Sequence, residues 1–159
     1  MEVQSALRDK TDYLDRWNAV EAPIRRALIA RYGHERGTEA FADARAYYWE
    51  HRERMANHPN LAGYLFRVGQ SAARRRRLRA ALIDRPADGV QDRPLDHRLA
   101  GALRGLSARQ RVCVVLVFAY DMERAEVAQI LGCDRSTVDT HVQRGLRRLR
   151  QALGEKTGR

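Results

Sequence analysis

The stretch Ala125-Glu-Val-Ala-Gln-Ile-Leu-Gly-Cys-Asp-Arg-Ser-Thr-Val138 indicates the fold of the last third of the chain. Ala128 is small, which lets two helices cross closely, and Gly132 four residues later suits a left-handed turn. Asp134 is a good N-cap for a second helix, and Val138 returns to the core. A small residue, a turn glycine and an apolar residue at these spacings predict a helix-turn-helix.

The second helix of this unit has an apolar face and a polar face. Val138, Val142, Leu146 and Leu149 recur at helical period. The opposite face carries hydroxyl, amide and guanidinium groups, which bind phosphates and base edges. We expect DNA contacts from Arg135, Ser136, Thr137, Asp139, Thr140, Gln143, Arg144 and Arg147. The alternative is an ordinary amphipathic helix with a solvated arginine face, which would not require the turn glycine.

Asp139 stands out in this set because a carboxylate repels DNA phosphates. It can nevertheless accept a hydrogen bond from cytosine N4. The alternative, which we favour, is a local pair with Arg135 or Gln143 at helical spacing.

The net charge of +10 is concentrated in two segments. Residues 66–85 contain seven arginines against Asp84 alone, and residues 140–159 are again basic, whereas residues 1–65 hold equal numbers of acidic and basic side chains. Two basic segments beside neutral ones are typical of a protein that binds a polyanion at two places.

Other classes of protein are poorly supported. No apolar run approaches the roughly 20 residues of a membrane span, and no signal peptide opens the chain, so we expect a cytoplasmic protein. Cys113 and Cys133 lie far apart in sequence and suit reduced thiols, and the histidines lack metal-ligand spacing. Because no phosphate loop or catalytic set is present, we expect no enzyme activity, no cofactor and no bound metal.

The helical patterns predict an all-α chain of two small domains, spanning residues 10–83 and 96–154. Residues 84–95 are polar, with two prolines and a glycine, and indicate a flexible linker. In the first domain we expect helices from Pro23 to Gly33, over about residues 38–56, and from an N-cap at Asn60 onwards. In the second, we expect a short helix over about residues 95–103 and an apolar helix over 112–118, capped by Ser107, rather than a strand.

The second domain resembles a known family. Leu106-Ser-Ala-Arg-Gln-Arg111, the helix-turn-helix and Leu146-Arg-Arg-Leu-Arg150 are similar to conserved region four of bacterial RNA polymerase sigma factors. The resemblance implies a module that reads the minus-thirty-five promoter element and docks on the flap of the polymerase β subunit.

The first domain resembles region two of the same family. The similar stretches are Tyr48-Trp-Glu-His-Arg-Glu-Arg54 and Asn60-Leu-Ala-Gly-Tyr-Leu-Phe-Arg-Val-Gly69 with the arginine run after it. Region two implies binding to the β′ clamp, for which Trp49, Arg52 and Glu53 are the candidates, and capture of the unwound minus-ten element. Having only these two regions is the pattern of the extracytoplasmic-function (ECF) group, and it makes core RNA polymerase, promoter DNA and an anti-sigma factor the candidate partners.

Capture of unwound DNA requires contacts to the backbone and to unstacked bases. We expect these contacts from Tyr64, Phe66, Arg67, Gln70, Ser71, Arg74, Arg75 and Arg77. Tyr64 and Phe66 are candidates for base stacking. Both aromatic rings could instead be core residues, an interpretation that we favour for Tyr64 and leave open for Phe66.

Three functions follow from the sequence. The first is an ECF sigma factor that directs promoter recognition and transcription initiation. The second is a stand-alone helix-turn-helix regulator without polymerase binding, which gains weight because Ala42 and Arg45 stand where the family usually has glutamine and phenylalanine. The third is a sigma-like interaction protein.

Overall fold

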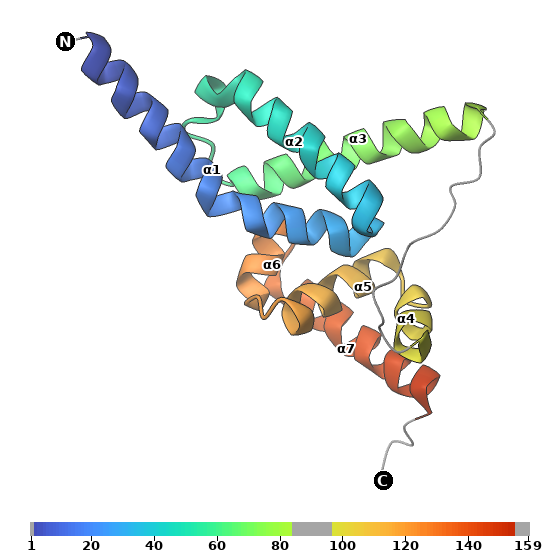
Figure 1. Ribbon diagram of the computed structural model, residues 1–159. Helices are drawn as coiled ribbons and strands as arrows, with labels where there is room; N and C mark the ends of the chain where they lie inside the picture. The colour runs from blue at the N-terminus through green and yellow to red at the C-terminus, as the bar shows by residue number, and fades with distance from the viewer. Residues whose placement is uncertain (1, 84–96, 155–159) are drawn as a thin grey trace.

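The computed structural model describes residues 2–83 and 97–154, and every regular element in these ranges is helical, as predicted (Figure 1). The elements are α1 (Glu2–Tyr32), α2 (His34–Met55), α3 (Leu61–Ile83), α4 (His97–Arg104), α5 (Ala108–Val114), the π-helical turn η1 (Val115–Ala119), α6 (Arg124–Leu131) and α7 (Arg135–Leu153). The predicted linker lies outside the described residues, and the domain boundaries remain a prediction. We call α1–α3 the amino-terminal half and α4–α7 the carboxyl-terminal half.

Helix α1 is much longer than the sequence predicted. The prediction that a helix begins at Pro23 is wrong, because Pro23 lies inside α1. A proline inside a helix removes one backbone hydrogen bond and favours a kink, and α1 changes direction in its middle (Figure 1). The turn before Pro23 is held by packing, since Trp17 is buried against Phe41 and Tyr48. The predicted end at Gly33 is confirmed, with φ at 83°.

The amino-terminal half is a unit of three helices, and the residue that begins α3 could be predicted from the sequence. Asn60 caps α3 as predicted, since its Oδ1 accepts a hydrogen bond from the Gly63 amide at 2.9 Å. The α2–α3 turn is also held by Arg16, whose guanidinium donates to the carbonyl oxygens of Met55 and His58 at 3.3 and 3.5 Å. These contacts fix the start of α3, the helix that carries the arginine run.

The carboxyl-terminal half begins its core with the predicted apolar helix. Ser107 and Gln110 form a reciprocal capping box at the start of α5, which satisfies two backbone amides of the first turn. Val112, Cys113 and Leu116 are fully buried. The helix ends in η1 rather than in regular α-helical turns. The choice of a helix over a strand for this valine-rich stretch is therefore confirmed.

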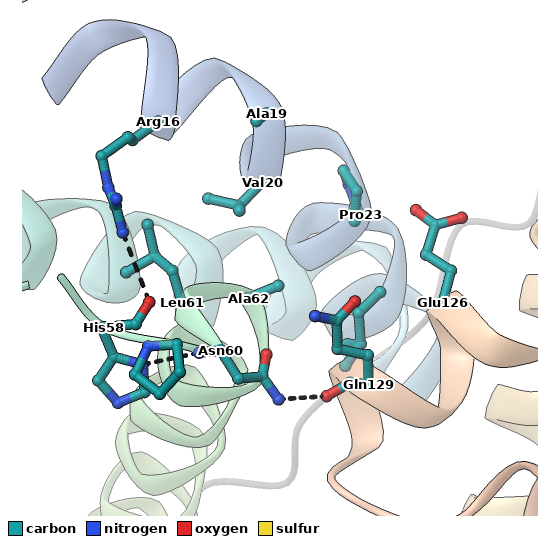
Figure 2. A pocket seen from close by; sticks show the side chains of 12 residues that line it. Arg16, Ala19, Val20, Pro23, His58, Asn60, Leu61, Ala62, Glu126 and Gln129 are labelled. Atoms are coloured by element: carbon teal, nitrogen blue, oxygen red, sulfur yellow. Dashed lines mark hydrogen bonds between the residues drawn. The ribbon is translucent and has the colours of Figure 1, made fainter. Parts of the chain in front are cut away.

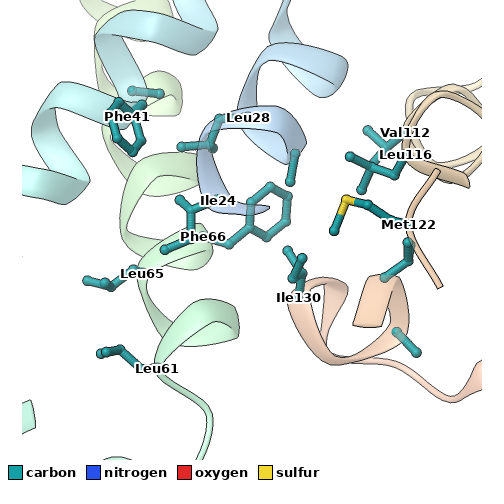
Figure 3. Packing of buried hydrophobic residues seen from close by; sticks show 14 of the residues in the cluster. Ile24, Leu28, Phe41, Leu61, Leu65, Phe66, Val112, Leu116, Met122 and Ile130 are labelled. Atoms are coloured by element: carbon teal, nitrogen blue, oxygen red, sulfur yellow. The ribbon is translucent and has the colours of Figure 1, made fainter. Parts of the chain in front are cut away.

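The two halves share one hydrophobic core. Figure 3 shows Phe66 between Ile24 of α1 on one side and Ile130 and Met122 of the carboxyl-terminal half on the other. We call this contact the inter-half interface. Polar contacts flank it. Asn60 Nδ2 donates to the Gln129 carbonyl at 2.8 Å, and the Arg26 guanidinium lies 5.3 Å from the ring centre of Tyr120.

A groove runs along the inter-half interface where α1, the α2–α3 turn and α6 meet (Figure 2). It has a volume of about 390 Å³, and its lining includes Val20, Asn60, Glu126 and Gln129. The halves therefore meet through apolar side chains at the centre and through mixed polar groups at the rim.

Candidate nucleic-acid interface

Helices α6 and α7 form the predicted helix-turn-helix. Gly132 ends α6 with φ at 64°, and the amide of Cys133 donates to the Ala128 carbonyl at 3.0 Å. Ala128 and Val138 are buried at the crossing of the two helices. Asp134 stands at the N-cap with an extended backbone, but its side chain makes no capping hydrogen bond. The predicted position is confirmed and the predicted capping bond is not formed.

Helix α7 packs its apolar face onto α5 and leaves its polar face open. Val138, Val142 and Leu149 are buried, and Gly145 lies so close to α5 that a Cβ there would be 2.7 Å from Val114 Cγ2. The exposed members of the predicted set are Arg135, Ser136, Thr140, Gln143, Arg144 and Arg147, and the half-buried ones are Thr137 and Asp139. The structure therefore brings all eight predicted side chains of α7 to its accessible side.

Thr140 is the one hydroxyl on this face whose proton is engaged. Its Oγ1 donates to the Ser136 carbonyl at 2.9 Å, one turn earlier in α7. In this conformation Thr140 can contact DNA as an acceptor, whereas Arg144 and Arg147 offer donors only.

Asp139 forms its ion pair with a residue of the other helix. Its Oδ1 lies 2.8 Å from Nε of Arg124, the first residue of α6. The favoured prediction of a local pair with Arg135 or Gln143 is therefore wrong, because the turn folds the start of α6 against the side of α7. Sequence spacing along one helix could not reveal this partner.

Burial favours the neutral form of one histidine and two cysteines near α7. Burial, followed by the charges of Arg109 and Arg144, lowers the pKa of His141. Burial raises the pKa of Cys113 to about 12 and raises that of Cys133. Both thiols are free, and no cluster of potential metal ligands occurs in the described part of the chain.

The arginine side chains of α3 point to two different sides of the helix. Arg67, Ser71, Arg74, Arg75 and Arg77 are exposed and Gln70 is half-buried, which gives α3 an open basic side. Arg76 instead turns to α2, where its guanidinium lies 2.7 Å from a carboxylate oxygen of Glu39 and 2.9 Å from Asp43. The hydrogen bond to Glu39 raises the pKa of Arg76.

The two aromatic candidates of α3 differ from each other in position. Phe66 is 2% exposed, so of the two interpretations that the sequence left open for its ring, the structure shows the core residue. Its side of α3 faces away from α2, as the helical period indicates, but the carboxyl-terminal half covers it. Tyr64 is half-buried, with its hydroxyl 3.0 Å from that of Tyr47, a bond that raises the pKa of Tyr64.

The predicted polymerase contacts lie on the last turns of α2. Trp49 is half-buried, with its ring 6.3 Å from that of Trp17, whereas Arg52 and Glu53 are exposed. Arg52 also donates to the Trp49 carbonyl at 2.7 Å. The three residues therefore form a small patch of one aromatic and two charged side chains, in which the Trp49 ring packs near that of Trp17.

The fold and the open face of α7 define an all-helical protein of the helix-turn-helix class. Residues 96–149 match the family described as Sigma-70, region 4. The chain is also similar to the ECF RNA polymerase sigma factor SigK of Mycolicibacterium vanbaalenii, with 33% identity over 88 residues that cover 53% of this chain and 45% of the relative. The chain thus spans about half the length of this curated relative.

The fold extends the similarity to both halves. The sigma factor RpoE of Bartonella quintana, solved in complex with the anti-sigma factor NepR, superimposes with a TM-score of 0.65 over 91% of this chain and 98% of RpoE, at 22% identity. The sequence similarity to sigma factors thus covers about half of the chain, and the structural similarity to RpoE shows that the two proteins share a fold. Within the described residues, no helix is both long enough and apolar enough to cross a bilayer.

Proposed function

We propose that this protein is a sigma factor that binds core RNA polymerase and directs promoter recognition and transcription initiation in the cytoplasm. The observation that carries the proposal is the open polar face of α7 in a region 4 helix-turn-helix, in one chain with the open basic side of α3. The role is one of binding, without enzyme activity or cofactor. The proposed partners are promoter DNA, the β′ clamp and the β flap, with an anti-sigma factor as a further candidate.

In this proposal α7 enters the major groove of the minus-thirty-five element. Arg144 and Arg147 supply charged donors for phosphates and guanine, and Ser136 and Gln143 offer shorter polar contacts to base edges. Because every phosphate contact releases bound counterions, binding should weaken steeply as salt rises. The apolar face of α7 stays on α5, so the recognition surface is held by a rigid support.

Helix α3 has a different task in the proposed function, because the minus-ten element is captured as a single strand. Arg67, Arg74 and Arg77 form a basic track for its backbone. Base stacking on Phe66 would require the inter-half interface to open, since α6 and α1 cover the ring. Tyr64 is more accessible, although its hydroxyl is already bonded to Tyr47.

The decisive experiment combines the purified chain with bacterial core RNA polymerase. Co-elution on a sizing column and new transcript starts on genomic DNA are expected. The variant carrying Arg144→Ala and Arg147→Ala should still co-elute but lose the starts. Binding to DNA fragments without any polymerase complex would favour the stand-alone regulator. If the chain bound neither polymerase nor DNA, the sigma-like interaction protein would be favoured.

A further inference from the structure

The ion pair between Arg124 and Asp139 lies at the edge of the DNA-facing side of α7. Asp139 is one helical turn from Ser136 and from Gln143, both of which are exposed. The two charged side chains are each 40% exposed, so the pair is accessible to a ligand rather than sealed in the core. Exposed ion pairs contribute little to stability, and stability alone is therefore a weak explanation for this one.

The ion pair leaves the Asp139 carboxylate able to accept a hydrogen bond from another group. Arg124 Nε approaches Asp139 Oδ1 to 2.8 Å, yet this nitrogen has no hydrogen-bond partner of good geometry. The contact is therefore an attraction between charges rather than a straight hydrogen bond. A carboxylate has two oxygens with about four acceptor positions in all, so most of its acceptor capacity is unused.

The charge of Arg124 also removes the electrostatic objection to a carboxylate in this place. An unpaired Asp139 would meet the phosphates of the groove with like charge, whereas the pair is neutral as a unit. Of the base edges in the major groove, a carboxylate accepts from the amino group of cytosine at N4. Asp139 is thereby suited to read a base without weakening the phosphate contacts of its neighbours.

We infer that Arg124 and Asp139 together form a specificity element, in which Asp139 reads a cytosine and Arg124 positions and neutralises the carboxylate. This inference rests on the proposed function and deepens it, since it names one base that the minus-thirty-five element contains. Asp139 is the residue that contacts DNA, and Arg124 acts through it.

The test is transcription from a library of duplex promoters randomised across the minus-thirty-five element, using holoenzyme reconstituted with the full chain. The wild type should enrich cytosine at one position. Asp139→Asn keeps the shape but offers an amide, which suits adenine, so enrichment at that position should move from cytosine to adenine by about tenfold and leave the other positions unchanged. Arg124→Gln should weaken the cytosine preference at the same position.

Glu126→Gln is the matched control, because it removes a carboxylate from α6 on the side that lines the inter-half groove. Its enriched sequences should equal those of the wild type. Thermal unfolding of each variant separates a lost fold from a lost preference. Reduced transcription in folded Asp139→Asn or Arg124→Gln without a change at any single position would assign the pair to structure alone and overturn the inference.

Failure of the proposed function gives a different result. If the wild-type chain forms no active holoenzyme, the sigma proposal fails, and the same library is selected by the full chain alone in a gel-shift assay. The shift from cytosine to adenine at one position is still required there. Absence of this shift, or of any binding to duplex DNA, overturns the inference.

Discussion

Gly37 lies at a close approach between α1 and α2. A Cβ at this position would lie 2.5 Å from Cα of Ile29, and backbone cannot move aside as a flexible side chain can. Gly37→Ala should therefore lower the free energy of unfolding by about 1–3 kcal/mol through overpacking. Gly101→Ala in α4 is the control, since a Cβ there meets nothing within 4 Å and should stabilise the helix by about 0.5–1 kcal/mol. Urea unfolding of the two variants measures both effects, and equal midpoints would refute the close contact.

Cys113 should be chemically inert in the folded protein. Burial raises the pKa of its thiol to about 12, so at pH 8 only about one molecule in ten thousand carries the reactive thiolate. Alkylation by iodoacetamide at pH 8 should therefore modify Cys133 first, because Cys133 is only partly buried. Labelling of Cys113 should require unfolding in urea. Rapid labelling of Cys113 in native buffer, followed by mass spectrometry, would show that α5 opens far more readily than its packing indicates.

Helix α7 is expected to lose DNA recognition, and not stability, when its exposed arginines are removed. Arg144→Ala with Arg147→Ala should abolish specific binding of holoenzyme to duplex promoter DNA, because both side chains are exposed on the polar face of α7. Arg148→Ala, to be compared with each single substitution as well as with the pair, removes one arginine from another side of the same helix, since Arg148 reaches back to Gln110 Oε1 at 3.4 Å. DNase footprinting of these proteins gives the comparison. Equal loss in the control would mean that net charge, rather than the polar face of α7, governs binding.

Helix α3 offers a contrast between arginines that face solvent and one that faces α2. Arg74→Ala with Arg77→Ala should weaken DNA binding almost equally for all sequences and flatten the dependence of binding on salt by about two phosphate contacts. Arg76→Ala should leave the salt dependence nearly unchanged, because Glu39 and Asp43 already bind this guanidinium. Salt titrations of affinity test both statements. A sequence-dependent loss in the double variant would instead show that these arginines read bases.

The elements that could be predicted are those whose signals are local in sequence. Asn60, Ser107 and Gly132 act on amides or carbonyls within five residues, so their roles follow from residue type and spacing alone. The part of α1 before Pro23 could not be predicted in this way, because Trp17 is held there by packing against Phe41 and Tyr48 of α2. The partner of Asp139 was missed for the same reason, since Arg124 lies on another helix.

In the whole molecule the two halves meet at the inter-half interface. The periodicity of a single helix could not predict this contact, because its residues come from both halves. The helical pattern of α3 places Phe66 on the side that faces away from α2. The carboxyl-terminal half covers this side chain, so Phe66 is buried in the whole molecule. The candidate base-stacking residue is thereby the centre of the contact between halves. The state described here and a state with Phe66 on DNA exclude each other.

Neighbouring residues of α3 allow this interface to be tested separately from the core beneath it. Figure 3 shows Leu65 on the side of the amino-terminal half and Phe66 toward Ile130. Phe66→Ala should remove about 3–5 kcal/mol, chiefly from the contact between halves, so that they unfold in two steps and the radius of gyration of the native protein rises. Leu65→Ala should destabilise the amino-terminal half while the protein stays compact. Calorimetry and small-angle X-ray scattering of both variants decide the matter, since a compact Phe66→Ala protein with one transition would mean that the halves are held together by contacts other than this ring.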